Sequence, residues 1–277
     1  MTLTETALDF AVLARTKTKA LRTNPLGFWI AAMMAGAYIG IGILLIFGVG
    51  ENVDPSVRSL VMGCSFGIAL TLVIFAGSEL FTGHAMFMTL GLLAGATSLG
   101  DLGRSWVVTW FGNLIGCIAL SVLFVVGGGG AILGEGADLL HVVATKKMTD
   151  SASELVARGM LCNWLVCLAI WTSARTDNDA AKCILIFWCL FAFIASGFEH
   201  SIANMTIFSV ALLSDHPDTV TYSGAAWNLL WVTIGNALSG VGLVGVAYWF
   251  VCGRPHLETV AGSSNSTAAR SPPTLGS

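Results

Sequence analysis

The sequence contains few charged residues for its length: only 10% of its 277 residues are charged, whereas 55% are hydrophobic. Soluble domains carry about 25% charged residues, so this composition excludes a soluble globular protein. The 13 Lys and Arg residues do not outnumber the 16 Asp and Glu residues. A chain without a basic excess does not hold a phosphate backbone, which excludes nucleic acid as a partner.

The sequence also lacks the cysteine and histidine spacings that are typical of metal sites and disulfide frameworks. The seven cysteines lie in apolar stretches, none belongs to a CxxC motif, and none has a histidine at ligand spacing. We therefore expect no disulfide framework, no metal site and no cofactor. The sequence has no HExxH motif, and it has no nucleophile and base that would lie at the same depth in a membrane. It therefore does not indicate an enzyme.

Six hydrophobic stretches are long enough to cross a bilayer, which takes about 20 mainly apolar residues. They cover residues 28–49, 60–93, 106–126, 155–174, 183–213 and 226–252. We therefore expect a transmembrane domain over residues 26–252 in an all-α protein embedded in the lipid bilayer.

The two ends of the chain are more polar than this domain. Residues 1–25 lack the apolar core of a cleaved signal, so we expect the first span to remain. The spacing of Leu8, Ala11 and Val12 predicts a short helix, which could lie at the membrane interface. Residues 253–277 are rich in Ser, Thr, Ala and Pro, and we predict a disordered cytoplasmic tail.

The distribution of Lys and Arg predicts the orientation. With a cytoplasmic N-terminus, six spans leave nine of the 13 basic residues inside, whereas the outer segments hold four, namely Arg58, Lys146, Lys147 and Arg158. An excess of Lys and Arg in cytoplasmic segments is the rule for membrane proteins. Both termini are therefore predicted to be cytoplasmic.

Two of the six stretches are too long for one helix, and each is interrupted by a polar segment. The segments read GSELFTGH from Gly77 and GFEHSIAN from Gly197, with Glu79 and Glu199 120 residues apart. Downstream, GNLIG from Gly112 resembles GNALSG from Gly235 at an offset of 123. The chain therefore divides into two halves of three spans.

Because each half has three spans, the second half enters the membrane from the opposite side and has inverted topology. Such an inverted 3+3 repeat has its site near the midplane, between broken helices. Non-helical backbone at that depth is tolerated only where it is buried inside the protein or lines a water-filled cavity. A charge there costs about 2.5 to 3.5 kcal/mol, so we expect Glu79 and Glu199 to have a role, preferably to shape the loops by accepting freed N–H groups. The pattern predicts a pore or carrier.

The two interrupted segments resemble the two signature motifs of the formate/nitrite transporter family. They are GSELFTGH from Gly77 and FEHSIANM from Phe198, and the resemblance extends over about residues 24–249. The segments NPLGFWIAAMMAGAYIG, RGMLCNWLVCLAIW and WVTIGNALSG look most like the bacterial nitrite transporter branch. The resemblance implies a homopentamer in the cell inner membrane, in which each aquaporin-like protomer encloses its own anion pathway.

The resemblance also implies roles for individual residues. The family's central histidine falls on His200, its first-loop threonine on Thr82 and its vestibule lysine on Lys147. Its pore asparagines fall on Asn163, Asn204 and Asn236, and its apolar constriction on Phe66, Leu70, Leu80, Phe81, Val166 and Phe193. Some members carry a second basic residue at the cytoplasmic entrance, where this sequence has Gly27 in the nearest motif and Arg22 only nearby.

Physical chemistry favours passage of a weak acid. A bare anion loses hydration worth several kcal/mol in an apolar constriction. An acid with a pKa of about 3.5 costs only about 5 kcal/mol to protonate at neutral pH. His200 could lend a proton or donate a hydrogen bond, because imidazole titrates near neutrality. The implied permeant is nitrite, with formate or another weak acid as the alternative.

Other channel types fit the sequence less well. An aquaporin-like channel for neutral solutes should carry Asn-Pro-Ala at both breaks, and neither break contains proline. An ammonium or gas channel would need a pore with paired histidines and usually more spans.

Overall fold

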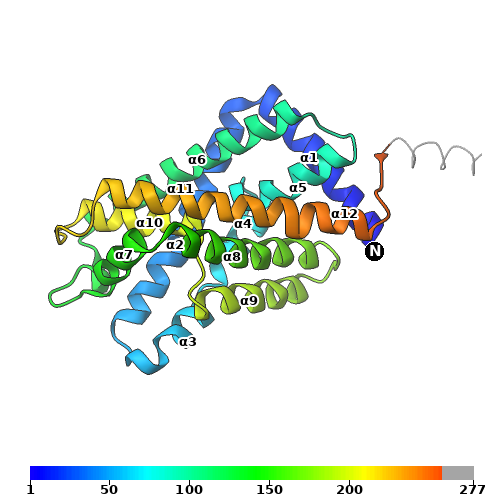
Figure 1. Ribbon diagram of the computed structural model, residues 1–277. Helices are drawn as coiled ribbons and strands as arrows, with labels where there is room; N and C mark the ends of the chain where they lie inside the picture. Colours follow the sequence, from blue (N-terminus) through cyan, green and yellow to red (C-terminus); the bar gives the residue numbers. More distant parts are fainter. Residues whose placement is uncertain (258–277) are drawn as a thin grey trace, which may run out of the picture.

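The computed structural model describes residues 1–257, which form helices and contain no strand. Figure 1 shows α7 at one end of the elongated bundle, and the N-terminus with α12 at the opposite end. The elements are α1 (Leu3–Thr23), α2 (Pro25–Glu51), α3 (Pro55–Ser65), α4 (Ile68–Phe75), α5 (Phe81–Leu93), α6 (Leu99–Val126), the 3-10 turn η1 (Gly130–Ile132), α7 (Leu139–Thr149), α8 (Ala152–Ser173), α9 (Asp179–Ala195), α10 (Ser201–Leu213), α11 (Tyr222–Leu238), the π-helix η2 (Ser239–Val246) and α12 (Ala247–Val251).

The starts of the long helices follow from local sequence. Capping boxes begin α1, α6 and α8, with the pairs Thr2–Glu5, Ser98–Asp101 and Ser151–Glu154. In each pair the two side chains satisfy N–H groups that the first turn leaves free. Proline opens α2 and α3, where its missing N–H is harmless.

Five helical segments are long and apolar enough to cross a membrane. They are Pro25–Glu51, Pro55–Phe75, Leu99–Val126, Ala152–Ser173 and Tyr222–Val251. The remaining predicted stretch, 183–213, is divided between α9 and α10, and α9 has 17 residues, fewer than the roughly 20 that a span usually takes. The stretch 60–93 is likewise divided, into α3–α4 and α5.

Both divisions fall at the polar segments, and they have the same geometry. Gly77 and Gly197 adopt φ of 74° and 68°, a left-handed conformation that glycine reaches without strain. Two residues later, the Glu79 N–H donates to the Ala31 carbonyl of α2 at 3.2 Å. The Glu199 N–H donates to the Arg158 carbonyl of α8 at 3.3 Å. The first broken helix is thus attached to α2 and the second to α8.

Two pairs of long helices, α2 with α6 and α8 with α11, are in very close contact. A side chain at Gly36 or Gly116 would overlap the backbone of the facing helix, so α2 and α6 meet there backbone to backbone. Gly159 and Gly235 have the same relation between α8 and α11. Small residues permit this approach in membrane helices. The two helix pairs therefore pack through glycines in the same way.

The helix predicted near the N-terminus is present as α1, and it packs against the protein. Ala7, Phe10 and Ala14 are buried in a cluster with side chains of α5. At the other end of the chain, the Leu257 N–H donates to the Ala94 carbonyl at 3.2 Å. The remainder of the predicted tail, 258–277, lies outside the described residues.

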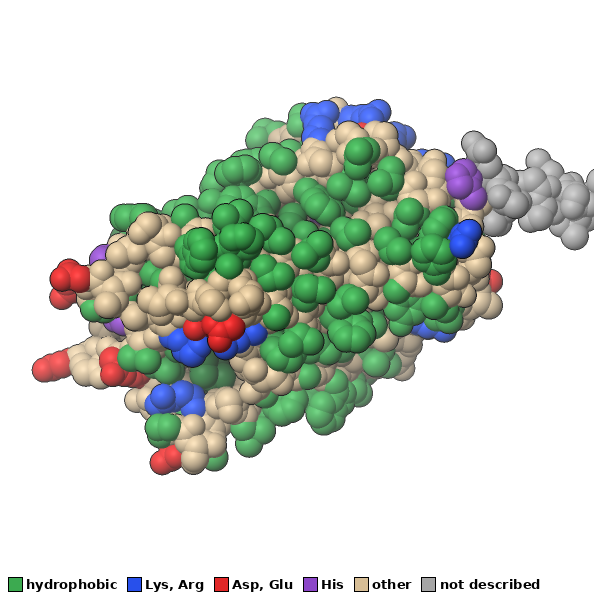
Figure 2. Space-filling model, in the orientation of Figure 1, with side chains coloured by type: hydrophobic (Ala, Val, Ile, Leu, Met, Phe, Trp, Pro, Cys, Tyr) green, Lys and Arg blue, Asp and Glu red, His purple; other side chains and the backbone are tan. Residues whose placement is uncertain are grey.

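Hydrophobic side chains cover the middle of the face in Figure 2, and charged side chains gather toward the ends. Large apolar side chains remain exposed on α6, α9 and α11, among them Leu123, Ile184 and Leu230. Exposed apolar surface of this extent is expected where helices face lipid.

Candidate functional site

Asn113 of α6 holds the first break in shape. Its Nδ2 donates to the carbonyls of Ala32 and Glu79 at 2.7 and 2.9 Å. Its Oδ1 accepts the Phe81 N–H at 2.9 Å. One buried amide therefore satisfies three backbone groups around the break, which is what broken backbone inside a membrane requires. Sequence reasoning did not assign this residue, although the repeated Gly-Asn pair marks it.

Asn236 of α11 does the same at the second break. Its Nδ2 donates to the carbonyls of Gly159 and Glu199 at 2.8 and 3.0 Å. Its Oδ1 accepts the Ser201 N–H at 2.9 Å. Asn163 of α8 donates to the Asn236 carbonyl at 2.6 Å. These two predicted pore asparagines therefore bind backbone.

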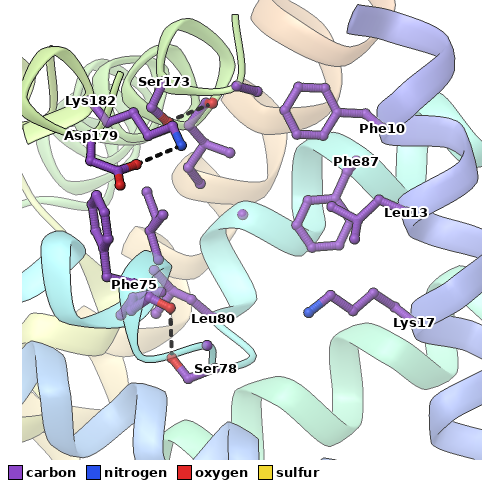
Figure 3. A pocket seen from close by; sticks show the side chains of 16 residues that line it. Phe10, Leu13, Lys17, Phe75, Ser78, Leu80, Phe87, Ser173, Asp179 and Lys182 are labelled. Atoms are coloured by element: carbon purple, nitrogen blue, oxygen red, sulfur yellow. Dashed lines mark hydrogen bonds and ion pairs between the residues drawn. The ribbon is translucent and has the colours of Figure 1, made fainter. Parts of the chain in front are cut away.

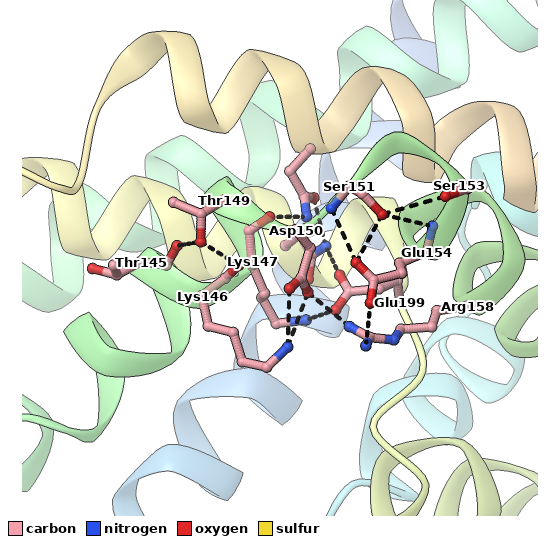
Figure 4. A network of polar contacts seen from close by, with 12 residues as sticks. Thr145, Lys146, Lys147, Thr149, Asp150, Ser151, Ser153, Glu154, Arg158 and Glu199 are labelled. Atoms are coloured by element: carbon pink, nitrogen blue, oxygen red, sulfur yellow. Dashed lines mark hydrogen bonds and ion pairs between the residues drawn. The ribbon is translucent and has the colours of Figure 1, made fainter.

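The Glu199 carboxylate is the centre of a polar network on the α7 side (Figure 4). One oxygen pairs with Lys147 Nζ at 2.7 Å, and the other accepts from Asn204 Nδ2 at 2.6 Å. Asn228 of α11 accepts from Asn204 at 2.8 Å and donates to the Lys147 carbonyl at 2.8 Å. This network ties α7 to the second broken helix.

The Glu79 carboxylate has a corresponding network on the α1 side. One oxygen pairs with Lys17 Nζ at 2.6 Å, and the other bonds to His84 Nε2 at 2.8 Å. His84 Nδ1 bonds to Ser105 Oγ at 2.6 Å. Lys17 is therefore the basic residue that pairs with Glu79, which sequence reasoning missed, whereas Arg22 forms an ion pair with Asp101.

His200 and Thr82 meet where the two broken helices approach each other. His200 Nε2 lies 3.2 Å from Thr82 Oγ1. His200 Nδ1 accepts the Ala203 N–H at 3.1 Å and so caps α10. Because Nδ1 is an acceptor, the proton of the neutral imidazole belongs on Nε2. His200 therefore presents an N–H donor toward Thr82.

A small apolar cavity lies against His200. Five of the six predicted constriction residues line it, together with His200, Ile39 and Leu190; the five are Phe66, Leu70, Leu80, Val166 and Phe193. The rings of Phe66 and Phe193 meet edge to face at 5.3 Å. Phe81 is placed elsewhere: its ring packs edge to face on Trp106 at 6.0 Å, in a groove between α6 and α11.

Two larger cavities adjoin the constriction, one on each side. The α7-side vestibule, a cavity of about 330 Å³, is lined by Lys147 and Asn204 and shares Phe193 and His200 with the constriction. The α1-side vestibule, of about 500 Å³, contains Lys17, as Figure 3 shows, and shares Leu80 with the constriction. Together they form a path along the protomer that apolar side chains narrow at its middle.

Apolar spanning helices, two broken helices and this path define a membrane transport protein. The chain belongs to the formate/nitrite transporter family, whose pattern it matches over residues 6–250. It is 55% identical to the nitrite transporter NirC of Salmonella typhimurium over 227 residues, covering 82% of this chain and 84% of that protein. It is 53% identical to NirC of Escherichia coli over 244 residues, covering 88% and 90%.

Solved structures agree with the family. An FNT family ion channel superposes with a TM-score of 0.87 at 52% identity, covering 90% of this chain and 99% of that one. A pentameric formate channel with formate bound superposes with a TM-score of 0.68 at 26% identity, covering 81% and 96%. The protein is therefore a multi-pass membrane protein of a transport family.

Proposed function

We propose that the chain moves nitrite across the bacterial inner membrane through a pathway within each protomer of a homopentamer. The observation that carries the proposal is His200, which contacts Thr82 and lines an apolar constriction between two vestibules that each contain a lysine. Both the NirC relatives and the pentameric neighbour support it.

We infer that the fold is an aquaporin-like inverted repeat of six spans. One half comprises α2, the broken α3–α5 and α6, and the other comprises α8, the broken α9–α10 and α11–α12. This division is supported by one asparagine clamp and one glycine contact in each half, and by the glutamate at each break, which pairs with a lysine on the helix that precedes that half. We place both termini in the cytoplasm, which the excess of basic residues on that side supports.

His200 acts in this proposal as a neutral hydrogen-bond donor. Its Nδ1 is occupied by the Ala203 N–H, and a proton there would place two donors face to face. The polar hydrogen on Nε2 remains to bind an oxygen of the permeant as it passes Thr82. Phe66 and Phe193 exclude water at this point, which favours the neutral acid over the bare anion.

Formate is the second candidate permeant, because a related solved structure is a formate channel with formate bound. Formate and nitrite are both small monovalent anions of weak acids, and nothing in the constriction lining excludes either. A channel for neutral solutes is less well supported, since both vestibules carry a lysine.

Initial uptake rates in proteoliposomes test the proposal. We expect nitrite uptake to exceed formate and lactate uptake, with water and ammonia no faster than in empty vesicles, and to rise when the outside is acidic. His200→Asn should reduce the rate at every pH between 5 and 8, because it shortens the donor, and should leave the pH dependence in place, because that dependence comes from protonation of the permeant. Nitrite uptake equal to that of empty vesicles would contradict the proposal.

A further inference from the structure

The two vestibules differ in the charge that their linings carry. On the α1 side, Lys17 pairs with Glu79 at 2.6 Å, and Lys182 pairs with Asp179 at 3.0 Å (Figure 3). Both cations of that lining therefore have an anionic partner. A close ion pair has a field that decreases much faster with distance than that of a single charge, so this vestibule attracts a distant anion weakly.

The lining of the α7-side vestibule contains one cation that is paired with a carboxylate and one that is not. Lys147 is neutralised by Glu199 at 2.7 Å. Arg58, on α3, lines the same cavity. Within the described chain, no carboxylate lies within 4.0 Å of the Arg58 guanidinium, whose Nε and Nη2 donate to the carbonyls of Gly50 and Val53 at 2.9 and 3.3 Å.

The acidic residues near Arg58 are engaged elsewhere. Asp54 accepts from the Ser56 N–H and hydroxyl at 2.8 and 2.6 Å. These bonds, and to a smaller extent the charge of Arg58, lower the pKa of Asp54, so this carboxylate is ionised at neutral pH. Glu51 accepts the Asp138 N–H at 3.3 Å. Neither Asp54 nor Glu51 lines the vestibule.

A structural role of Arg58 is compatible with this position. The Gly50 carbonyl belongs to the last turn of α2, and a cation is favourable at the C-terminus of a helix. The two bonds to carbonyls use Nε and Nη2, which leaves the second terminal nitrogen, Nη1, without a protein partner among the described residues. Guanidinium remains protonated in proteins, so the full charge is retained in the vestibule.

We infer that Arg58, and not Lys147, is the residue that recruits small anions into the α7-side vestibule. Anions arriving from that side therefore bind with a higher apparent affinity than anions arriving from the α1 side. The inference rests on the proposed function. It predicts a lower KM for nitrite supplied on the α7 side than for nitrite supplied on the α1 side, although both cross the same constriction.

Nitrite uptake into vesicles of one known orientation tests the inference. With nitrite on the α7 side at 20 mM salt, Arg58→Gln should raise the KM about two- to fivefold and leave the maximal rate nearly unchanged. At 500 mM salt the difference should largely disappear, because the ions screen the charge. Arg58→Lys should restore most of the affinity. With nitrite on the α1 side, none of these changes should appear.

The control is Lys146→Gln, since Lys146 lies on α7, is 64% exposed in its side chain, pairs with Asp150 and does not line the cavity. Lys146→Gln should leave the KM unchanged. The melting temperature of each variant shows whether Arg58 also stabilises the end of α2, a structural role that would not make the KM depend on salt. An unchanged KM for Arg58→Gln, or an equal rise at both salt concentrations, would overturn the inference. Absence of nitrite uptake by the wild type would instead contradict the proposed function.

Discussion

Replacing Lys147 by Met should destabilise the protein strongly, because it leaves a buried carboxylate without its cation. The Glu199 side chain is 3% exposed, and Lys147 is the cation that pairs with it at 2.7 Å. Removing one partner of a buried pair costs about 3 to 5 kcal/mol. Asn204 still donates to Glu199, and Lys147 borders the vestibule, where water can enter. We therefore expect a loss near the lower limit, about 3 kcal/mol.

Thermal unfolding of the purified protein measures this loss. Lys146→Met is the matched control on the same helix: its ion pair with Asp150 is exposed at the lysine, and exposed pairs contribute about 0 to 1 kcal/mol. The double variant Lys147→Met/Glu199→Gln removes the carboxylate charge of Glu199 together with its lysine. It should recover most of the stability that Lys147→Met loses. The reasoning is refuted if Lys147→Met and Lys146→Met unfold alike, or if the double variant is no more stable than Lys147→Met.

Three further predictions concern packing, polar networks and pH. Gly116→Ala should destabilise by about 1 to 3 kcal/mol, because its Cβ would overlap the α2 backbone, whereas Gly48→Ala meets open space and should be neutral in the same unfolding measurement. His84→Asn should preserve assembly in size-exclusion chromatography, since Asn204 binds Glu199 from five residues downstream, as His84 binds Glu79; loss of assembly would contradict the proposed equivalence. Burial and then the charge of His216 lower the pKa of His141, so the unfolded chain binds the proton first as the pH falls below about 6.5. Wild-type melting temperatures should therefore fall from pH 7 to 5 and those of His141→Gln should fall less; equal slopes would show that His141 does not contribute.

The positions of the two breaks were predictable from sequence because polar residues inside apolar stretches are costly. Glu79 and Glu199 marked both breaks, and the structure gives each carboxylate a lysine. The family motifs singled out His200 and Thr82, whose side chains lie 3.2 Å apart, and six constriction residues, of which five line one cavity; their roles stay predictions. Phe81 differs because it begins α5 and its ring is turned toward Trp106, away from the constriction cavity.

The identity of the second lysine could not be predicted from spacing. Lys17 is 62 residues from Glu79 and belongs to α1, which lies outside the repeat, so only the packing of α1 on α5 brings the two together. The length of α9 was also not readable from hydropathy, because the apolar run continues through the break into α10. Asn113, by contrast, was visible in the repeated Gly-Asn pair. Its role depends on hydrogen bonds to backbone, which a sequence pattern does not display.

The central claim is that nitrite passes through the constriction inside each protomer. Val166 is 3% exposed and lines that cavity, so Val166→Trp should fill it. The most direct measurement is the initial rate of nitrite uptake into proteoliposomes for the wild type and for Val166→Trp of the same assembly and melting temperature. The account predicts saturable uptake by the wild type and a rate close to that of empty vesicles for Val166→Trp. Equal rates for the two proteins would contradict it.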